Sequence, residues 1–502
     1  MIFLYTMPFI IGFIFALFVP IDFFFRIEWF LFGLEFNVDV IAKQFLFFTS
    51  FVWLISAFYA FYTITQEKKQ YFFWFILTFV GNYFLCFSFD VISFYILFSL
   101  MSISSFGLIL HTQTHKAKQA AFVYIKYAIF GEIIIFIGIV SLVFHFGSFN
   151  FYNFTNSQII FAHLLILIGF GIKVGVFLLH SWLPLAHTNA PASASAVLSA
   201  VMLKAGVLGW LRFFNETLVY EQMVVYALMI AGVLGILIGF YGLFQDKLKA
   251  ILAYSSISQM GFVVMMFSLA MYDTSNYQAI ITAISFFIIH HAFNKAAIFL
   301  LANEIKRSGL NILNLFIFFV ASLSLIGLPF TSGALAKKLF KEEIHSSLFL
   351  VFLTMGSIIT AMLMIRFYLL SKEYTVNKTI TKESVIITPL VMMSLLLAYI
   401  HDFTFSFSVW QFLPLLIAVV FFLIIVKNNI LLKLLPQGDL LHLLPPFPSF
   451  EKKIEKSYYK STKLFYKTKL FFVKVEKTLH KQHYVFFLAI MVLLIWLIIV
   501  VF

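Results

Sequence analysis

Long apolar runs dominate this chain of 502 residues, and they set the limits on how it can fold. Hydrophobic residues make up 63% of the sequence and charged residues only 11%, whereas a soluble domain carries about 25% charged residues. Runs of about 20 apolar residues match the length of a helix that crosses a bilayer. We therefore expect an all-α polytopic membrane protein with about 14–15 transmembrane helices.

The expected spans follow one another along almost the whole chain. They lie at residues 2–19, 43–64, 72–89, 90–111, 120–146, 158–180, 194–214, 222–244, 250–271, 278–302, 311–342, 346–370, 384–401, 407–426 and 484–502. The stretch 22–42 is short and charged, so we interpret it as an interfacial excursion. The first span lacks a basic start and a small-residue cleavage site, which predicts that it is retained.

Basic loops alternate with loops that contain no Lys or Arg. The basic ones hold Lys68–Lys69, His115–Lys118, Lys247–Lys249, Lys306–Arg307 and Lys372–Lys378; the others are 147–157, 215–221, 272–277 and 402–406. Basic loops are typical of the cytoplasmic side. This alternation places the N-terminus outside the cytoplasm and predicts a multi-pass protein of the cell (inner) membrane.

Two spans carry helix-breaking residues, one around Trp182–Pro184 and one around Gly327, Pro329 and Gly333. Interrupted helices at corresponding places in two halves are typical of inverted-repeat transporters. The sequence therefore predicts two inverted five-helix repeats with broken helices. The expected parts are 1–71 (N-terminal helices), 72–214 (first repeat), 222–370 (second repeat), 384–426 (C-terminal helices), 451–483 (lateral helix) and 484–502 (anchor helix).

The segment 451–483 differs from the rest, because it contains ten Lys and three Glu. Apolar residues recur through it at spacings of one face of a helix: Ile454, Tyr458, Phe465, Phe472, Val475 and Leu479. This pattern predicts a basic amphipathic lateral helix along the cytoplasmic side, against lipid headgroups or partner spans. A solvated basic linker is the alternative.

Four lysines lie inside apolar segments: Lys173, Lys204, Lys295 and Lys337. Even on lenient scales, an ammonium in hydrocarbon costs about 2.5–3.5 kcal/mol. Each lysine is therefore expected to face a protein-lined, partly hydrated interior, where it can gain and lose a proton. The four residues favour a chain of proton-relay sites.

The surroundings of these lysines form linked motifs. Lys173 is followed by His180-Ser-Trp-Leu-Pro-Leu-Ala-His187, by Ala190-Pro191 and by Leu203-Lys204-Ala-Gly206. The segment Asp246-Lys-Leu-Lys-Ala-Ile-Leu-Ala-Tyr-Ser-Ser-Ile-Ser-Gln-Met-Gly261 comes next, and His291 lies one helical turn before Lys295.

Over roughly residues 40–370, these motifs resemble the antiporter-like subunits of the respiratory complex I superfamily. That superfamily includes the pumping subunits of NADH:quinone oxidoreductase, the Mrp-type cation/proton antiporters and the membrane-bound hydrogenases. The resemblance implies that the four lysines pass protons along a hydrated axis at mid-membrane, with His291 and His187 as bridges. It also implies that the basic tail is similar to the lateral helix of some members.

Two positions depart from the family pattern. Ser99 stands where a glutamate usually partners the lysine matching Lys173, and Phe287 stands where a histidine usually precedes His291 by one turn. Glu132, in the next span, is a candidate replacement for the missing carboxylate. The alternative is that Glu132 pairs locally with Lys126 or faces an interface.

Other ionisable residues in these spans have structural interpretations. His180 is expected to satisfy backbone groups freed by the helix break, which is also an alternative for His187. We expect His290 to be structural. Lys126, Lys338 and Lys341 suit interfacial or snorkelling positions, and Asp246 and Lys249 are expected to cap a helix start.

Three function classes remain open. The first is an ion-translocating subunit, moving protons or Na⁺, beside other membrane subunits that supply redox energy as in an NADH:quinone oxidoreductase or a hydrogenase. The single Cys86 excludes a disulfide framework and a cysteine-ligated cluster, so we expect no cofactor, metal site or redox centre on this chain, and nothing indicates nucleic-acid binding. The second class is an Mrp-type antiporter or an inorganic-carbon uptake module, which pairs such a subunit with a large soluble zinc protein. The third is a structural subunit with a degraded channel, which Ser99 favours.

Overall fold

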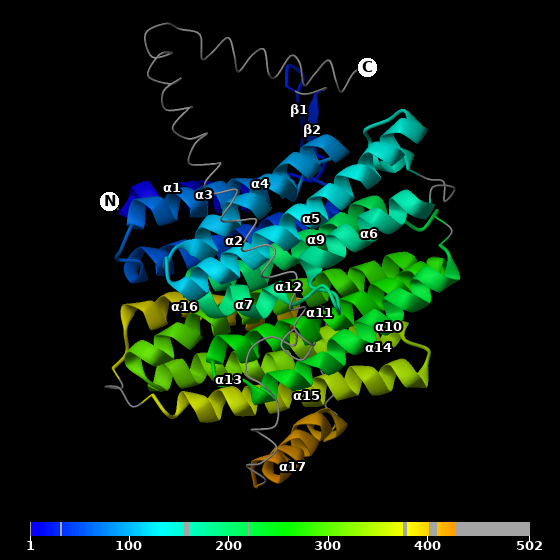
Figure 1. Cartoon of the computed structure of the whole chain (residues 1–502). Helices are drawn as coiled ribbons and strands as arrows, with labels where there is room; N and C mark the ends of the chain where they lie inside the picture. Colours follow the sequence, from blue (N-terminus) through cyan, green and yellow to red (C-terminus); the bar gives the residue numbers. More distant parts are fainter. Residues whose placement is uncertain are drawn as a thin grey trace, which may run out of the picture. The chain divides into compact units, whose positions relative to one another are not determined.

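The computed structural model describes residues 2–30, 33–154, 160–218, 220–374, 379–400 and 409–427. Figure 1 shows its elements in chain order. The helices are α1 (Ile2–Phe18), α2 (Val40–Thr63), α3 (Lys68–Leu85), α4 (Val91–Leu110), α5 (His115–Phe146), α6 (Ile160–Val174), α7 (Trp182–Asn189), α8 (Ala192–Val197), α9 (Leu203–Phe213), α10 (Gln222–Ile238), α11 (Leu248–Tyr272), α12 (Tyr277–Ser308), α13 (Ile312–Ile326), α14 (Ser332–Glu343), α15 (Ser347–Ser371), α16 (Lys382–Ile400) and α17 (Leu413–Lys427).

Every expected span before residue 427 coincides with one helix or with consecutive helical segments. Among the described residues, nine helical segments are long and apolar enough to cross a membrane, and shorter apolar helices accompany them. The expected all-α polytopic membrane fold is confirmed. The expected helices at 451–483 and 484–502 lie outside the described residues.

The segment 22–42 is not a span, as expected, but it contains a small antiparallel hairpin. Strands β1 (Phe24–Ile27) and β2 (Leu34–Asn37) pair Phe24 with Asn37 and Ile27 with Leu34. Figure 1 shows the hairpin extending beyond the helices. An isolated bridge between Phe36 and Ser88 ties β2 to the segment between α3 and α4.

Contacts between loops support the two-sided layout. On the face that carries the basic loops, here called the basic face, side-chain pairs join distant elements: Arg307 with Glu383 (3.1 Å) and Arg366 with Asp246 (3.0 Å). On the opposite face, the contacts are Arg212 with Asp39, Tyr277 Oη with the Phe214 carbonyl (2.7 Å) and Gln278 Nε2 with Glu216 Oε2 (2.6 Å). The two sets share no loop, which is the arrangement that the charge pattern predicts.

The first helix break lies between α6 and α7, over residues 175–181, and not at Trp182–Pro184 as the sequence suggested. Gly175 and Leu178 adopt positive φ angles of 79° and 73° there, a conformation that ends a helix and favours glycine. Trp182 Nε1 donates to the Ile172 carbonyl at 3.0 Å, which satisfies a backbone group freed by the break. Pro184 lies in the first turn of α7, where a missing N–H costs nothing.

The second break lies between α13 and α14, as the sequence predicts. Gly327 ends α13 with a φ of 87°, and the Thr331 hydroxyl accepts a hydrogen bond from the Ala334 N–H at the start of α14. Gly333, also predicted to interrupt the helix, instead lies inside α14, where it allows a close approach. A Cβ at this position would lie 1.7 Å from the Ser324 carbonyl oxygen.

The order of helix contacts is similar in the two expected repeats. In the first, α3 packs on α4, α4 on α5, α5 on both α6 and α7, and α6 on α9. In the second, α10 packs on α11, α11 on α12, α12 on both α13 and α14, and α13 on α15. Each set crosses the membrane an odd number of times, which would give the second the opposite orientation. These contacts support the division into 72–214 and 222–370, which stays a proposal.

We predict that Gly333→Ala destabilises the protein, because the new methyl group would collide with the Ser324 backbone. Overpacking of this kind costs about 1–3 kcal/mol or more. The measurement is the amount and the thermal midpoint of the protein in purified membranes. Gly171→Ala is the matched control, since a Cβ there would meet its nearest atom at an ordinary 3.4 Å; equal midpoints for both variants would contradict the prediction.

A second prediction concerns Asp39, which precedes α2 and pairs with the buried Arg212 of α9. Burial acts to raise the pKa of the Asp39 carboxyl, but the Arg212 charge and hydrogen bonds, together with the Ala42 and Ile41 N–H groups, hold this pKa below its usual value. A lowered folded-state pKa adds stability above the unfolded value of about 3.9, and this stability is lost as the pH falls through the folded value.

We therefore expect Asp39→Asn to lower the free energy of unfolding by about 2–4 kcal/mol near neutral pH, because it leaves Arg212 buried and unpaired. The difference from the wild type should shrink as the pH falls below about 4. Thermal midpoints of the purified protein over a pH series provide the measurement. A difference that stays constant down to the lowest pH would rule out the ion pair as its cause.

Candidate functional site

Lys204 and His291 meet in the interior of the protein. Lys204 lies directly after a π-helical turn, η2 (Leu198–Met202), which joins α8 to α9. Its Nζ lies 2.7 Å from His291 Nδ1 of α12 and donates to the Ser199 carbonyl at 2.5 Å. Both side chains are 0% exposed. Because π turns shift the register of a helix, this turn sets the direction in which Lys204 points.

Lys204 and Lys295 are linked by the buried residues Ser199, Ser256 and Leu252, through two backbone carbonyls and two hydroxyls. Ser199, whose carbonyl accepts from Lys204, has its hydroxyl 2.9 Å from the Ser256 hydroxyl. Ser256 donates to the Leu252 carbonyl at 3.0 Å, and Lys295 Nζ donates to the same carbonyl at 3.1 Å. Two lysines that are 91 positions apart in the sequence therefore share one buried network with His291.

Lys173, in the last turn of α6, has a separate polar environment. Its Nζ donates to the Ser102 hydroxyl and to the Tyr124 hydroxyl, both at 3.0 Å. The Phe98 and Tyr124 rings also lie near the ammonium, at 5.8 and 5.4 Å from their centroids. Helices α4, α5 and α6 thus surround this lysine with hydroxyls and aromatic faces.

Glu132 of α5 faces the same space as Lys173. The carboxyl group is buried at 6% exposure. Both ionisable side chains line a cavity of about 10 Å³, about the smallest volume that holds one water molecule. Lys126, the alternative partner of Glu132, is exposed on the same helix. The geometry favours the carboxylate as a partner of Lys173.

Lys337 of α14 lies at the second helix break. Its Nζ donates to the Ile326 carbonyl at 2.5 Å and to the Ser357 hydroxyl at 2.6 Å. Ile326 is the last residue of α13, so the break supplies the carbonyl that receives the ammonium.

The three other histidines of the motifs differ in their contacts. His187 is 0% exposed, its ring lies 4.6 Å from the Phe299 ring, and neither ring nitrogen has a hydrogen-bond partner in the described part of the chain. It therefore does not satisfy freed backbone groups. His180 lies at the first break, stacked on Phe177. His290 Nδ1 lies 2.9 Å from the Ser332 hydroxyl.

Two residues expected to cap a helix do something else. No side chain caps the start of α11. Asp246 pairs with Arg366, and Lys249 Nζ donates to the Ala190 carbonyl at 2.6 Å, where the chain turns between α7 and α8. Lys341 is exposed and Lys338 makes a surface pair with Glu342, in agreement with their expected interfacial positions.

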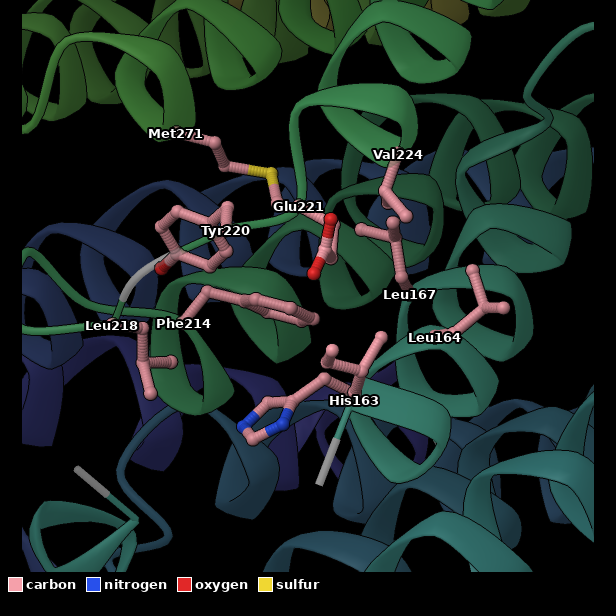
Figure 2. A pocket seen from close by; sticks show the side chains of 10 residues that line it. His163, Leu164, Leu167, Phe214, Leu218, Tyr220, Glu221, Val224 and Met271 are labelled. Atoms are coloured by element: carbon pink, nitrogen blue, oxygen red, sulfur yellow. The ribbon is translucent and has the colours of Figure 1, made fainter. Parts of the chain in front are cut away.

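A larger pocket lies at the face opposite the basic one, apart from the lysines. Figure 2 shows His163, Phe214, Tyr220 and Glu221 around it. Its volume is about 30 Å³, and most of its lining is apolar. Among the described residues, no group of three His, Cys, Asp or Glu side chains could hold a metal ion.

Sequence reasoning missed the hydroxyl groups around the lysines, namely Ser102 and Tyr124 at Lys173, and Ser199 and Ser256 between Lys204 and Lys295. Serines are common in membrane helices, where they often bond to their own backbone. The one available signal was that Ser199 and Ser256 lie in or beside the lysine motifs.

A family profile described as "NADH:quinone oxidoreductase/Mrp antiporter, TM" matches residues 88–363. A Na(+)/H(+) antiporter subunit from Alkalihalophilus pseudofirmus is 26% identical over 75% of this chain and 82% of its own length. NADH-quinone oxidoreductase subunit M of Rickettsia bellii is 28% identical over 70% of this chain and 74% of its own. Hydrogenase-4 component B of Escherichia coli is 31% identical, but the match covers 42% of this chain and 34% of that protein.

Solved structures share the fold. A chain of the Mrp complex from a Dietzia species superposes with a TM-score of 0.68 at 17% identity, covering 86% of this chain and 93% of that one. A chain of the membrane-bound sulfane sulfur reductase, an archaeal respiratory membrane complex, gives the same TM-score and identity over 79% and 87%.

Proposed function

The chain belongs to the NADH:quinone oxidoreductase/Mrp antiporter family of membrane proteins, and from this premise we propose that it is a proton-translocating, or cation/proton antiporting, subunit of a multisubunit membrane complex. The observation that carries the proposal is the buried network from His291 through Lys204 to Lys295. Ionisable groups inside a membrane protein mark ion pathways, because their burial is costly.

We propose the relay residues expected from the sequence: Lys173, Lys204, Lys295, Lys337, His291, His187 and Glu132. Lys204, His291 and Lys295 form its centre. Lys173, together with Glu132, precedes this centre in the chain. Lys337, at the second break, follows it. A proton on one lysine repels a proton on the next, so loading one site favours release from its neighbour.

We propose that neighbouring membrane subunits supply the energy for ion transport, since the names of similar proteins describe subunits of larger assemblies. The basic face would lie in the cytoplasm and the protein in the cell (inner) membrane. Its partners would then be other membrane subunits, the lipid bilayer and protons or Na⁺. Inorganic-carbon uptake stays a prediction from the sequence.

We predict that Lys204→Ala and Lys295→Ala each reduce ion transport by about tenfold or more, because each removes a proton carrier from the central network. The assay uses membrane vesicles that hold the native complex, with an imposed pH or sodium gradient, and follows protons with a dye and sodium with a radiolabel. Lys126→Ala, which removes an exposed lysine, is the control. Normal transport by both central variants would favour a structural subunit with a degraded channel.

A further prediction addresses the carboxylate missing at Ser99. If Glu132 partners Lys173, Glu132→Gln should impair transport about as much as Lys173→Ala, by about tenfold or more. Ser99→Glu in the Glu132→Gln background should restore part of the rate, because Ser99 faces the same carboxylate position. Full activity in Glu132→Gln would contradict Glu132 as the partner of Lys173 and would leave the proposal for Lys204, His291 and Lys295 unaffected.

A further inference from the structure

Two aromatic rings stack in a row from His291 of the Lys204–His291 pair to α14, the helix of Lys337. Phe287 lies one turn before His291 on α12, and its ring stacks on the imidazole at 6.2 Å with an interplanar angle of 18°. On α14, the helix of Lys337, Phe340 stacks with Phe287 at 4.8 Å and 21°. Two buried phenyl rings offer no hydrogen-bonding atom to a proton, so a proton path between Lys204 and Lys337 cannot run through this stack.

His290, the residue before His291 on α12, belongs to a group of buried polar side chains that we call the serine cluster: His290, Asn294, Ser324, Ser332 and Ser394. His290 Nδ1 is 2.9 Å from Ser332 Oγ, which is 2.9 Å from Ser394 Oγ and 3.1 Å from Ser324 Oγ. Asn294 Nδ2 donates to Ser394 Oγ at 2.8 Å. All five side chains are 0% exposed, and they come from α12, α13, α14 and α16.

This cluster lies at the second helix break, beside Lys337. Ser324 lies two residues before Ile326, whose carbonyl accepts a hydrogen bond from the Lys337 ammonium. Ser332 is the first residue of α14. The lack of a Cβ at Gly333 lets the Ser324 carbonyl and the His290 ring approach the helix start. His290 is also the neighbour in sequence of His291, which contacts Lys204, so the cluster adjoins both the Lys204–His291 pair and the break that holds Lys337.

Two atoms of the cluster have unused hydrogen-bonding capacity. His290 Nε2 and Asn294 Oδ1 are buried and have no partner within the described residues. A buried polar atom without a partner costs about 1–3 kcal/mol, and such atoms usually bind water or serve a function. A purely structural histidine would need only the bond from Nδ1.

We propose that His290 and the hydroxyls of Ser332, Ser324 and Ser394 carry protons between the Lys204–His291 pair and Lys337. This inference rests on the proposed function and adds a path that bypasses Phe287 and Phe340. It gives His290 a role that the sequence alone did not favour.

The Lys204 ammonium gives up a proton through water to His290 Nε2 and becomes a neutral amine. The resulting imidazolium releases its Nδ1 proton to Ser332 Oγ, while the Ser332 hydroxyl passes its own proton to Ser394 or Ser324. The hydroxyl of Ser394 or Ser324, having received this proton, passes its own proton through water to a neutral Lys337 amine, which becomes an ammonium. One proton moves, and every serine keeps one.

The test measures proton transport in membrane vesicles holding the full complex, under an imposed gradient, for His290→Gln, Ser332→Ala and Ser394→Ala. We expect His290→Gln to lower the rate by about tenfold or more and the serine variants by smaller factors, with normal amounts of assembled complex. The solvent deuterium isotope effect should rise in the serine variants, because fewer hydroxyls remain to pass the proton. His163→Gln, at the pocket on the opposite face, is the control and should leave the rate unchanged.

A double variant sharpens the test. The Phe287 ring lies 5.9 Å from the His290 ring and 6.2 Å from the His291 ring, centroid to centroid. Phe287→His therefore introduces an imidazole near both histidines. We expect it to restore much of the rate in the His290→Gln background.

Normal transport in His290→Gln, with transport lost in Lys204→Ala and Lys337→Ala, overturns the bypass and leaves the proposed function intact. If His290→Gln fails to assemble, unchanged rates and isotope effects in both serine variants overturn it equally. Normal transport in Lys204→Ala instead contradicts the proposed function itself.

Discussion

The contact between the Lys204 ammonium and the His291 imidazole, 2.7 Å long and fully buried, is the interaction on which the remaining arrangement depends. It joins α9, the last helix of the first expected repeat, to α12, the central helix of the second. Neither group is stable alone in an apolar interior, because a buried charge needs polar partners. The π turn before Lys204, which contains Ser199, and the long α12, which carries His291, place these partners at the ammonium.

The helix breaks solve a related problem in two ways. A break frees backbone carbonyls, and in a membrane each freed group needs a donor. At the first break the Trp182 indole N–H donates to the Ile172 carbonyl. At the next turn of the chain, Lys249 of α11 donates to the Ala190 carbonyl. At the second break the Lys337 ammonium itself takes the Ile326 carbonyl. The second break therefore provides a binding site for a charged group as well as interrupting the helix.

The sequence was enough to place the helices, the second break and the buried lysines, because these follow from apolar length, from glycine and proline, and from charge in an apolar run. The first break was misplaced by several residues, since a positive φ at Leu178 and a bond from Trp182 to Ile172 depend on the folded chain. The serine links also escaped prediction. A serine in a membrane helix looks the same in sequence whether it bonds to its own helix or, like Ser199, to a neighbouring one. For Asp246, the pattern of a capping residue was misleading because its true partner, Arg366, lies 120 positions away.

The π turn at Leu198–Met202 has a consequence for how this chain can change over evolutionary time. Such a turn contains one residue more than a turn of α-helix, and each residue of an α-helix rotates the chain by about 100°. If all the residues here wound into regular α-helix, Lys204 would turn through roughly that angle, away from His291. Losing one residue together with the π turn would instead leave the direction of Lys204 nearly unchanged. The π turn and the number of residues in this segment are thus constrained together, more tightly than the identity of most of its side chains.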